Sequence, residues 1–214
     1  MANRLVAVLD NDDVILRMGD KKLAYMRDYF PNQEVIRDIR PYECSRTALV
    51  PIIGMEFYNR MNAIVKGRES TLSMPPFDGA VEGIKALSDL YELHALSART
   101  PQETDHVKER LGTLGIEKYF KSISSTEDPK YDGIEHVSGV KKVDASLYLG
   151  ASAFTDDDER HMPNGIIRGL HCYLFGEGER NIGAHIVVVR NWQELVARHR
   201  ELATPLTRFN DIES

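Results

Sequence analysis

Short apolar runs recur along the chain, and several of them are continuous rather than alternating. They cover Leu5–Leu9, Leu93–Leu96, Ile123 with its serine neighbours, Ser146–Leu149, Cys172–Phe175 and Ile186–Val189. A strand in a parallel sheet shows such a continuous run, because helices cover both faces of the sheet and both sides of the strand are buried. The pattern therefore predicts the strands of a parallel sheet.

Segments with helical periodicity lie between these runs. Gly79–Leu90 carries its apolar residues on one stripe, and Asn191 opens another such segment, NWQELVARHRELA. A third helix is predicted to begin with Thr100 as its N-cap and Pro101 at the first helical position. Strands that alternate with helices predict an α/β fold with a parallel sheet.

One long stretch interrupts this alternation. About eighty residues without a convincing strand separate the first two strands, and a structureless loop of that length is unusual. Two of its segments, ILRMGDKKLAYMRDYF and TALVPIIGMEFYNRMNAIVKG, have helical periodicity, and SMPPFDG (Ser73–Gly79) ends the stretch. We predict an α/β core of residues 1–15 and 75–204, a helical insertion of residues 16–74 above the sheet, and a poorly ordered tail of residues 205–214.

Composition narrows the class of protein. The chain has 214 residues, 42% of them hydrophobic and 28% charged, as in soluble globular proteins. Its net charge of −6 argues against a nucleic-acid polymer as the main partner. No apolar stretch approaches the roughly 20 residues of a membrane span, and no signal peptide is recognisable. Two distant cysteines, Cys44 and Cys172, fit a reducing, cytoplasmic setting.

The first predicted strand runs directly into Asp10, Asp12 and Asp13, with Asn11 between the first two. In an open parallel sheet, ligands bind outside the carboxyl ends of the strands. The alternate spacing of Asp10 and Asp12 predicts that both carboxylates approach one point, where Mg²⁺ would relieve their repulsion. The alternative interpretation is a polar turn, in which Asp and Asn are common.

Polar residues that could bind a phosphate or a metal ion follow three more apolar runs. Ser97 ends the second strand just before a helix begins, where a hydroxyl and free N–H groups make an anion site. Lys130 follows the Ile123 strand and could neutralise a phosphate; the alternative is a solvated surface lysine. Asp156, Asp157 and Asp158 follow the Ser146–Leu149 run. Their alternative interpretation is the acidic first turn of a helix.

Taken in order, these four elements resemble the motifs of the haloacid dehalogenase (HAD) superfamily. Asp10–Val14 matches the first motif, Asp-x-Asp-x-Val/Thr, and Ser97 matches the second. Lys130 is the better candidate for the lysine of the third motif, with Lys141 and Lys142 as rivals. The fourth motif is a strand followed by acids.

The resemblance covers the whole chain and implies a three-layer, Rossmann-like core with a parallel sheet. The helical insertion resembles the C1 cap of the superfamily. A looser likeness to the 5′(3′)-deoxyribonucleotidases rests on PPFDGAVEGIKALSDL, STEDPK and VVVRNWQEL. The second acid, Asp12, distinguishes the phosphatases of the superfamily from its dehalogenases.

The chemistry implied by the resemblance is Mg²⁺-dependent hydrolysis of a phosphomonoester, such as a nucleotide or another small phosphorylated metabolite. Asp10 would attack phosphorus and form an aspartyl-phosphate. Asp12 would protonate the leaving oxygen and then activate water. Mg²⁺ would be held by Asp10, the backbone carbonyl of Asp12, and Asp156. The groups that would hold the phosphoryl oxygens are Ser97, the amides of Ala98 and Arg99, and Lys130.

One departure from the family pattern bears on activity. Gly150-Ala151 falls where family members often have Gly-Asp, so the first ligand of the fourth motif would be missing and Asp156 would supply the other. Alternatively, Asp157 and Asp158 are the paired acids, although little chain then remains before the next strand. A missing ligand keeps open an alternative function, a protein of this fold that has lost turnover and binds a phosphorylated ligand or a protein partner.

Overall fold

The computed structural model describes residues 4–134, 137–176 and 183–210, with side chains up to residue 204. Its centre is a six-stranded sheet in the order β3-β2-β1-β4-β5-β6. All neighbouring strands pair in parallel, as predicted. The strands are β1 (Leu5–Leu9), β2 (Tyr91–Ser97), β3 (Phe120–Ser125), β4 (Ala153–Asp156), β5 (His171–Phe175) and β6 (Ile186–Val189).

Helices cover both faces of this sheet. In the central strand β1, Ala7 and Leu9 face one apolar cluster and Val8 faces the other, because successive side chains of a strand point to opposite faces. Helices α6 (Ala80–Ser88), α7 (Pro101–Thr113) and α9 (Trp192–Asn210) contribute to the first cluster, and α8 (Lys141–Tyr148) contributes to the second. The predicted three-layer α/β fold is therefore confirmed.

The predicted helix starts are also confirmed. The hydroxyl of Thr100 accepts a hydrogen bond from the amide of Glu103 (3.3 Å), and Pro101 begins α7. The side chain of Asn191 accepts from the amide of Glu194 (2.9 Å) at the start of α9. Each cap satisfies an amide that has no partner inside its own helix.

The strand predicted at Ser146–Leu149 is wrong. Residues 146–148 form the end of α8, and Gly150 follows in the left-handed region (φ 79°). The strand comes later, as β4. An apolar run of four residues does not distinguish a strand from a buried helical turn, and the sequence of β4, Ala-Phe-Thr-Asp, is only half apolar.

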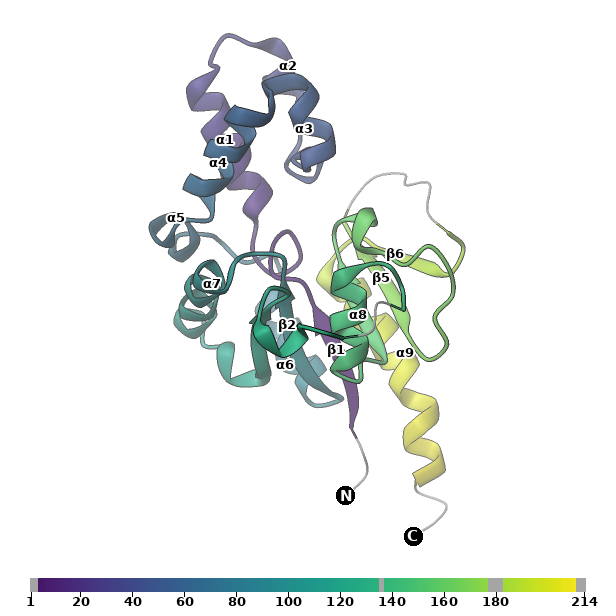
Figure 1. Cartoon of the computed structure of the whole chain (residues 1–214). Helices are drawn as coiled ribbons and strands as arrows, with labels where there is room; N and C mark the ends of the chain where they lie inside the picture. The colour runs from purple at the N-terminus through teal and green to yellow at the C-terminus, as the bar shows by residue number, and fades with distance from the viewer. Residues whose placement is uncertain (1–3, 135–136, 177–182, 211–214) are drawn as a thin grey trace.

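Five helices lie between β1 and α6, in the stretch predicted to be a helical insertion. They are α1 (Met18–Tyr29), α2 (Glu34–Asp38), α3 (Arg46–Ile53), α4 (Met55–Val65) and α5 (Arg68–Leu72). They stand over the carboxyl ends of the strands, at the end of the sheet opposite both chain termini (Figure 1). The two connections between insertion and core run side by side, since Leu16 and Pro76 form an antiparallel bridge.

Helix α9 continues to Asn210, and residues 211–214 lie outside the described residues. The poor order expected of residues 205–214 stays a prediction. The first turns of α9 are fixed on the sheet by Trp192, and a helix that is already nucleated extends at little further cost. Figure 1 shows the end of α9 projecting past the sheet. Within the described ranges, no helix is both long enough and apolar enough to cross a bilayer.

Helices α6 and α9 approach each other closely at Gly83. A Cβ added there would lie 2.4 Å from Cε3 of Trp192, a side chain that is 1% exposed. We expect Gly83→Ala to lower the free energy of unfolding by about 1–3 kcal/mol, because the overpacked ring cannot move away. The control is Gly112→Ala in α7, where the new Cβ meets only the end of the Glu117 side chain. This control should be neutral or stabilising by up to about 1 kcal/mol. Urea unfolding compares the two variants, and equal effects would contradict the packing argument.

A buried histidine predicts a pH effect on stability. His199 of α9 packs against the rings of Tyr91 and Tyr173, and neither of its ring nitrogens has a hydrogen-bond partner among the described residues. Burial lowers the pKa of His199 to about 3. Below the unfolded pKa of about 6.5, the unfolded chain therefore binds a proton that the folded chain does not, and stability is lost as the pH falls.

When the pH falls from 7 to 5, the free energy of unfolding should decrease by about 2 kcal/mol because of this histidine. His199→Phe should remove that part of the pH dependence, whereas His106→Gln, at a partly exposed position, should keep it. Urea unfolding of the three proteins at both pH values measures the difference. An unchanged pH dependence in His199→Phe would show that other groups cause the loss.

Candidate active site

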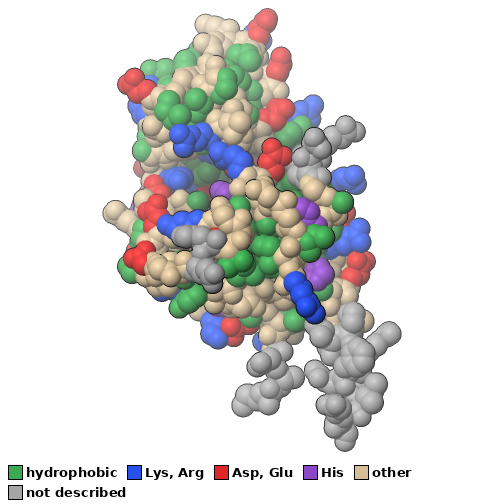
Figure 2. Space-filling view, turned by 45° about the vertical axis from the view of Figure 1, so that its right-hand side comes forward, with side chains coloured by type: hydrophobic (Ala, Val, Ile, Leu, Met, Phe, Trp, Pro, Cys, Tyr) green, Lys and Arg blue, Asp and Glu red, His purple; other side chains and the backbone are tan. Residues whose placement is uncertain are grey.

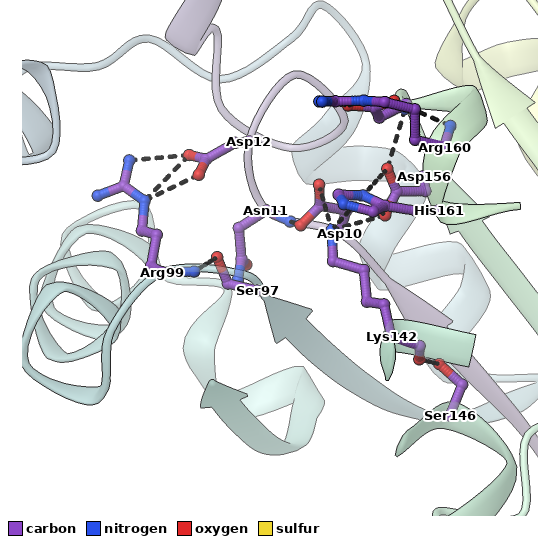
Figure 3. A network of polar contacts seen from close by, with 11 residues as sticks. Asp10, Asn11, Asp12, Ser97, Arg99, Lys142, Ser146, Asp156, Arg160 and His161 are labelled. Carbon is purple, nitrogen blue, oxygen red and sulfur yellow. Dashed lines mark hydrogen bonds and ion pairs between the residues drawn. The ribbon is translucent and has the colours of Figure 1, made fainter. Parts of the chain in front are cut away.

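The candidate site lies at the carboxyl ends of three adjacent strands, β2, β1 and β4. Asp10 follows β1, Ser97 is the last residue of β2, and Asp156 is the last residue of β4. Parallel strands end at one edge of the sheet, so residues far apart in the chain meet there (Figure 3). The sequence predicted all three residues for this edge.

A buried lysine joins the acids. The ammonium of Lys142, in the first turn of α8, lies 2.9 Å from Oδ2 of Asp10 and 2.6 Å from Oδ2 of Asp156. The three side chains are 3%, 5% and 0% exposed. Burial raises the pKa of Asp10 to about 7, although Lys142 opposes this rise. Burial would also raise the pKa of Asp156, but Lys142 and His161 hold it below its ordinary value.

The structure corrects the expected lysine. Lys130 lies exposed in the turn Pro129–Tyr131, with its ammonium 4.8 Å from the ring centroid of Tyr131. Lys142, one of its two rivals, contacts the nucleophile candidate instead, and Lys141 is exposed. The prediction looked for the lysine directly after β3. The residue that reaches the strand ends comes from the next helix, because the start of α8 lies beside them.

The acidic residues after β4 also differ from the prediction. Carboxylate oxygens of Asp10, Asp156 and Asp157 all lie within 4.8 Å of one another. Ala151 precedes β4 and is 8% exposed within an apolar cluster, so the expectation that it replaces a metal ligand is wrong. The carboxylate of Asp158 does not join this group, because it accepts hydrogen bonds from Arg160 (2.9 Å from Nε). The acids after β4 that meet Asp10 are therefore Asp156 and Asp157.

This three-carboxylate set fits a hard divalent cation such as Mg²⁺, which prefers oxygen ligands. Burial raises the pKa of Asp157 well above its ordinary value, and the neighbouring charges of Asp156, Asp13 and Asp10 raise it further. Negative charge is thus in excess at this point even with Lys142 present. A bound cation would relieve the excess, because it favours the ionised form of each carboxylate.

Asp12 does not converge on the same point as Asp10, contrary to the prediction. In Figure 3, Asp12 points away from Asp10 and toward Arg99. The guanidinium of Arg99 lies 2.9 Å from Oδ2 (Nε) and 2.8 Å from Oδ1 (Nη2) of Asp12, and the Arg99 side chain is 0% exposed. Burial would raise the pKa of Asp12, but the charge and hydrogen bonds of Arg99 bring it below its ordinary value. Asp12 is therefore ionised.

Arg99 also reaches the insertion. Its Nη1 donates to the hydroxyl of Thr71 (2.9 Å) and to the backbone carbonyl of Lys66 (3.4 Å). The prediction used only the backbone amide of Arg99, which here donates to the hydroxyl of Ser97 (3.1 Å). The pairing of Asp12 with Arg99 was missed because nothing local in the sequence links two residues 87 positions apart.

A cavity of about 130 Å³ lies between the strand ends and the insertion. Asp10, Asp12 and Ala98 of the predicted set line it, whereas Ser97 is buried behind its wall. The other lining residues from the core are Asp13, Lys142, Asp157, Asp158, Arg160 and His161, and those from the insertion are Met18, Lys22, Pro41, Tyr42, Cys44, Ser45, Arg46, Tyr58, Asn62 and Lys66.

His161 is a site residue that the sequence reasoning missed. Its Nδ1 lies 3.1 Å from Oδ1 of Asp156 and 3.3 Å from the ammonium of Lys142. Burial would lower the pKa of His161, but Asp156 raises it above its ordinary value. The only signal in the sequence was its position five residues after Asp156, in the short turn Glu159–His161.

Known proteins resemble this chain in fold but not detectably in sequence. No protein-family model matches the chain, and no curated protein matches it by sequence. Among solved structures, a HAD-superfamily hydrolase of subfamily IA from Geobacter sulfurreducens is 15% identical, with a TM-score of 0.56 over 91% of this chain and 96% of that one. A protein from Bacillus subtilis described as a HAD hydrolase, solved with bound magnesium, is 16% identical (TM-score 0.56, 92% and 99% covered).

The same fold is also found with another chemistry. A defluorinating L-2-haloacid dehalogenase is 12% identical to this chain, with a TM-score of 0.51 over 92% of this chain and 95% of that one. The fold alone therefore does not choose between hydrolysis of a phosphate ester and dehalogenation, and the choice rests on the residues of the site. The comparisons establish that this chain has the fold of the HAD-superfamily hydrolases, as its four motifs implied.

Proposed function

We propose that this chain is a Mg²⁺-dependent phosphomonoester hydrolase that works through an aspartyl-phosphate on Asp10. The observation that carries the proposal is the meeting of Asp10, Asp156 and Asp157 with Lys142 in one cavity at the strand ends. Its substrate is a small phosphorylated metabolite rather than a nucleic-acid polymer or a membrane component, and its setting is the cytoplasm.

In the first step, a carboxylate oxygen of Asp10 attacks phosphorus, and the bond between phosphorus and the leaving oxygen breaks. Lys142 holds the Asp10 carboxylate in place through a 2.9 Å contact, so the nucleophile is oriented before substrate binds. Bound at Asp10, Asp156 and Asp157, Mg²⁺ would supply the positive charge that screens the phosphoryl oxygens. The amide of Ala98, at the cavity wall, is a donor for one of those oxygens.

Asp12 performs the proton transfers in this proposal. It gives a proton to the leaving oxygen in the first step. In the second step it accepts a proton from the water that attacks phosphorus, and the bond between phosphorus and Asp10 breaks. Arg99 favours the ionised form of Asp12, which suits the second step. For the first step Asp12 must be protonated, so its hydrogen bonds with Arg99 have to weaken when substrate binds.

The size of the cavity bears on the substrate. Sites for drug-sized ligands usually measure about 300–1,000 Å³, and this cavity measures about 130 Å³. That volume matches a metabolite with a few carbon atoms. A larger leaving group would extend into a neighbouring cavity of about 340 Å³, which shares Asp13, Pro41, Tyr42 and Asp157 with this one.

A second candidate function is a protein of this fold that binds a phosphorylated ligand without turnover. The loss of a ligand at Ala151 no longer supports it, because Asp156 and Asp157 supply the paired acids. The observation that now favours it is the buried pairing of Asp12 with Arg99, which keeps the proposed acid away from Asp10.

The deciding experiment is a phosphate-release assay over small phosphomonoesters, sugar phosphates and mononucleotides, with Mg²⁺ and with EDTA. We expect Mg²⁺-dependent release that is fastest for the smallest substrates. Borohydride reduction during turnover should convert the phosphorylated Asp10 to homoserine, which peptide mass spectrometry identifies. Ligand binding without phosphate release from any substrate would support the second candidate.

A further inference from the structure

Lys22 of α1 is a buried cation without an ion-pair partner. The residue is 5% exposed, and its ammonium donates to the backbone carbonyl of Cys44 (3.1 Å) and lies 5.8 Å from the ring centroid of Tyr58. Among the described residues, no carboxylate lies within ion-pair distance of it. A buried ammonium whose charge is not paired lowers the stability of a fold. The charge of Lys22 helps to lower the pKa of Asp12 and opposes the rise in the pKa of Asp13, but neither carboxylate forms an ion pair with it. The ammonium therefore keeps room for direct contact with an anion in the cavity.

Lys22 and its neighbours in the insertion line the side of the cavity that faces the strand ends. Met18 and Lys22 lie one turn apart on α1, and Tyr58 and Asn62 lie one turn apart on α4, so each pair shares a helix face. All four line the cavity, as does Lys66 at the end of α4. The amide oxygen of Asn62 is buried without a hydrogen-bond partner among the described residues, so a donor from a ligand would satisfy it.

The charges of the cavity are divided between its two walls. The core contributes the acids, which are Asp10, Asp12, Asp13, Asp157 and Asp158, and its lysine, Lys142, is committed to Asp10 and Asp156. Among charged residues, the insertion contributes only cations, Lys22, Arg46 and Lys66, on the opposite side. The ammonium of Lys66 also lies 3.8 Å from Glu103. On the face shown in Figure 2, lysine and arginine side chains gather along the boundary between the insertion and the core.

We propose that Lys22, assisted by Lys66, binds a second anionic group, a carboxylate or a phosphate, on the leaving group of the substrate. This inference rests on the proposed function, because it takes the first phosphate to lie at Asp10. The cavity of about 130 Å³ leaves room for only a few carbon atoms between the two anions. The substrate class is therefore a small phosphomonoester that carries a second acidic group. A hydroxyl of the substrate near Asn62 would donate a hydrogen bond to its amide oxygen.

The test uses pairs of substrates that differ only in the second anion. The carboxylate pair is 2-phosphoglycolate and 2-hydroxyethyl phosphate, and the phosphate pair is propane-1,3-diol bisphosphate and 3-hydroxypropyl phosphate. The wild type should favour the member with the second anionic group in one pair by about 10- to 100-fold in kcat/KM, the value of one charge-assisted hydrogen bond. The pair with the larger ratio identifies the anion.

Lys22→Met should reduce that ratio to within about threefold of unity, mainly through KM. The variant should fold, since replacing a buried, unpaired lysine by an apolar residue of similar volume is neutral or stabilising. Lys21→Met is the matched control: Lys21 is the adjacent lysine on the same helix, and its ammonium bonds to the hydroxyl of Ser73 outside the cavity. This control should keep the wild-type ratio.

Two outcomes would overturn the proposal: a wild type that does not discriminate within either pair, and a Lys22→Met variant that lowers both members of a pair equally. Failure of the proposed function is distinguishable, because the wild type would then release no phosphate from any of the four compounds. In that case calorimetry of 2-phosphoglycolate and 2-hydroxyethyl phosphate binding to the wild type and to Lys22→Met still measures the ratio. Equal affinities in the wild type would then reject the role of Lys22.

Discussion

Asp10→Asn should reduce phosphatase activity by roughly 10⁴-fold or more, the loss seen when a covalent nucleophile is removed. An amide oxygen is a poor nucleophile and a poor ligand for Mg²⁺, yet the side chain keeps nearly the same shape. The folded state should survive. Burial raises the pKa of Asp10 from about 4 in the unfolded chain to about 7. The opposition of the ionised group to folding therefore builds up between these two pH values and is complete above pH 7, and the variant loses it.

The measurements for this variant are steady-state phosphate release and thermal unfolding without metal at pH 8. Asp105→Asn is the control, because Asp105 is exposed on α7 and does not line the cavity. It should retain activity within about threefold of the wild type. Wild-type turnover in a contaminant-free preparation of Asp10→Asn would exclude Asp10 as the nucleophile.

Lys142→Met should lower the free energy of unfolding by about 3–5 kcal/mol and abolish turnover, because it leaves Asp10 and Asp156 buried without their shared cation. Urea unfolding of the metal-free protein at pH 7 measures the loss. Added Mg²⁺ should restore part of the stability, since a cation that binds only the folded state stabilises it by mass action.

Lys130→Met provides the comparison, since the sequence favoured Lys130 for the same role. Lys130 is exposed, and the ring of Tyr131 is the only contact of its ammonium in the described part of the chain. The free energy of unfolding should therefore stay within about 0.5 kcal/mol of the wild type, and the activity should stay close to that of the wild type. If instead Lys130→Met were the inactive variant, the pairing of Lys142 with the acids would be structural only.

The parts of the fold that could be predicted from the sequence are those with a local signal. The apolar runs in β1 and β5 are long enough to show burial on both faces, and the run in β6 is continuous although Val187 is 39% exposed at the edge of the sheet. The Thr100-Pro101 start of α7 has its own cap chemistry. The prediction of strand β4 was wrong for a physical reason. Its four residues end in Thr155 and Asp156, which are buried by the site rather than by apolar packing.

The candidate site was predictable where a residue directly ends a strand, as with Asp10 and Ser97. The error at Ala151 followed from the misplaced strand, because a shift of that strand moves every acid after it. Lys142 and His161 reach the site from elements beside the sheet, and only the three-dimensional packing brings them there. The same holds for Arg99 and Asp12, whose contact depends on the position of the insertion.

The buried contacts of Arg99 have an evolutionary consequence. Losing Arg99 alone would leave Asp12 charged and buried, and losing Asp12 alone would leave an unpaired guanidinium in a dry environment. Either single change is costly, so substitutions at these two positions should occur together in related chains. Thr71, whose hydroxyl accepts a hydrogen bond from the same guanidinium, should change with them. The residue at position 71 of the insertion should therefore covary with the residues at positions 12 and 99 of the core.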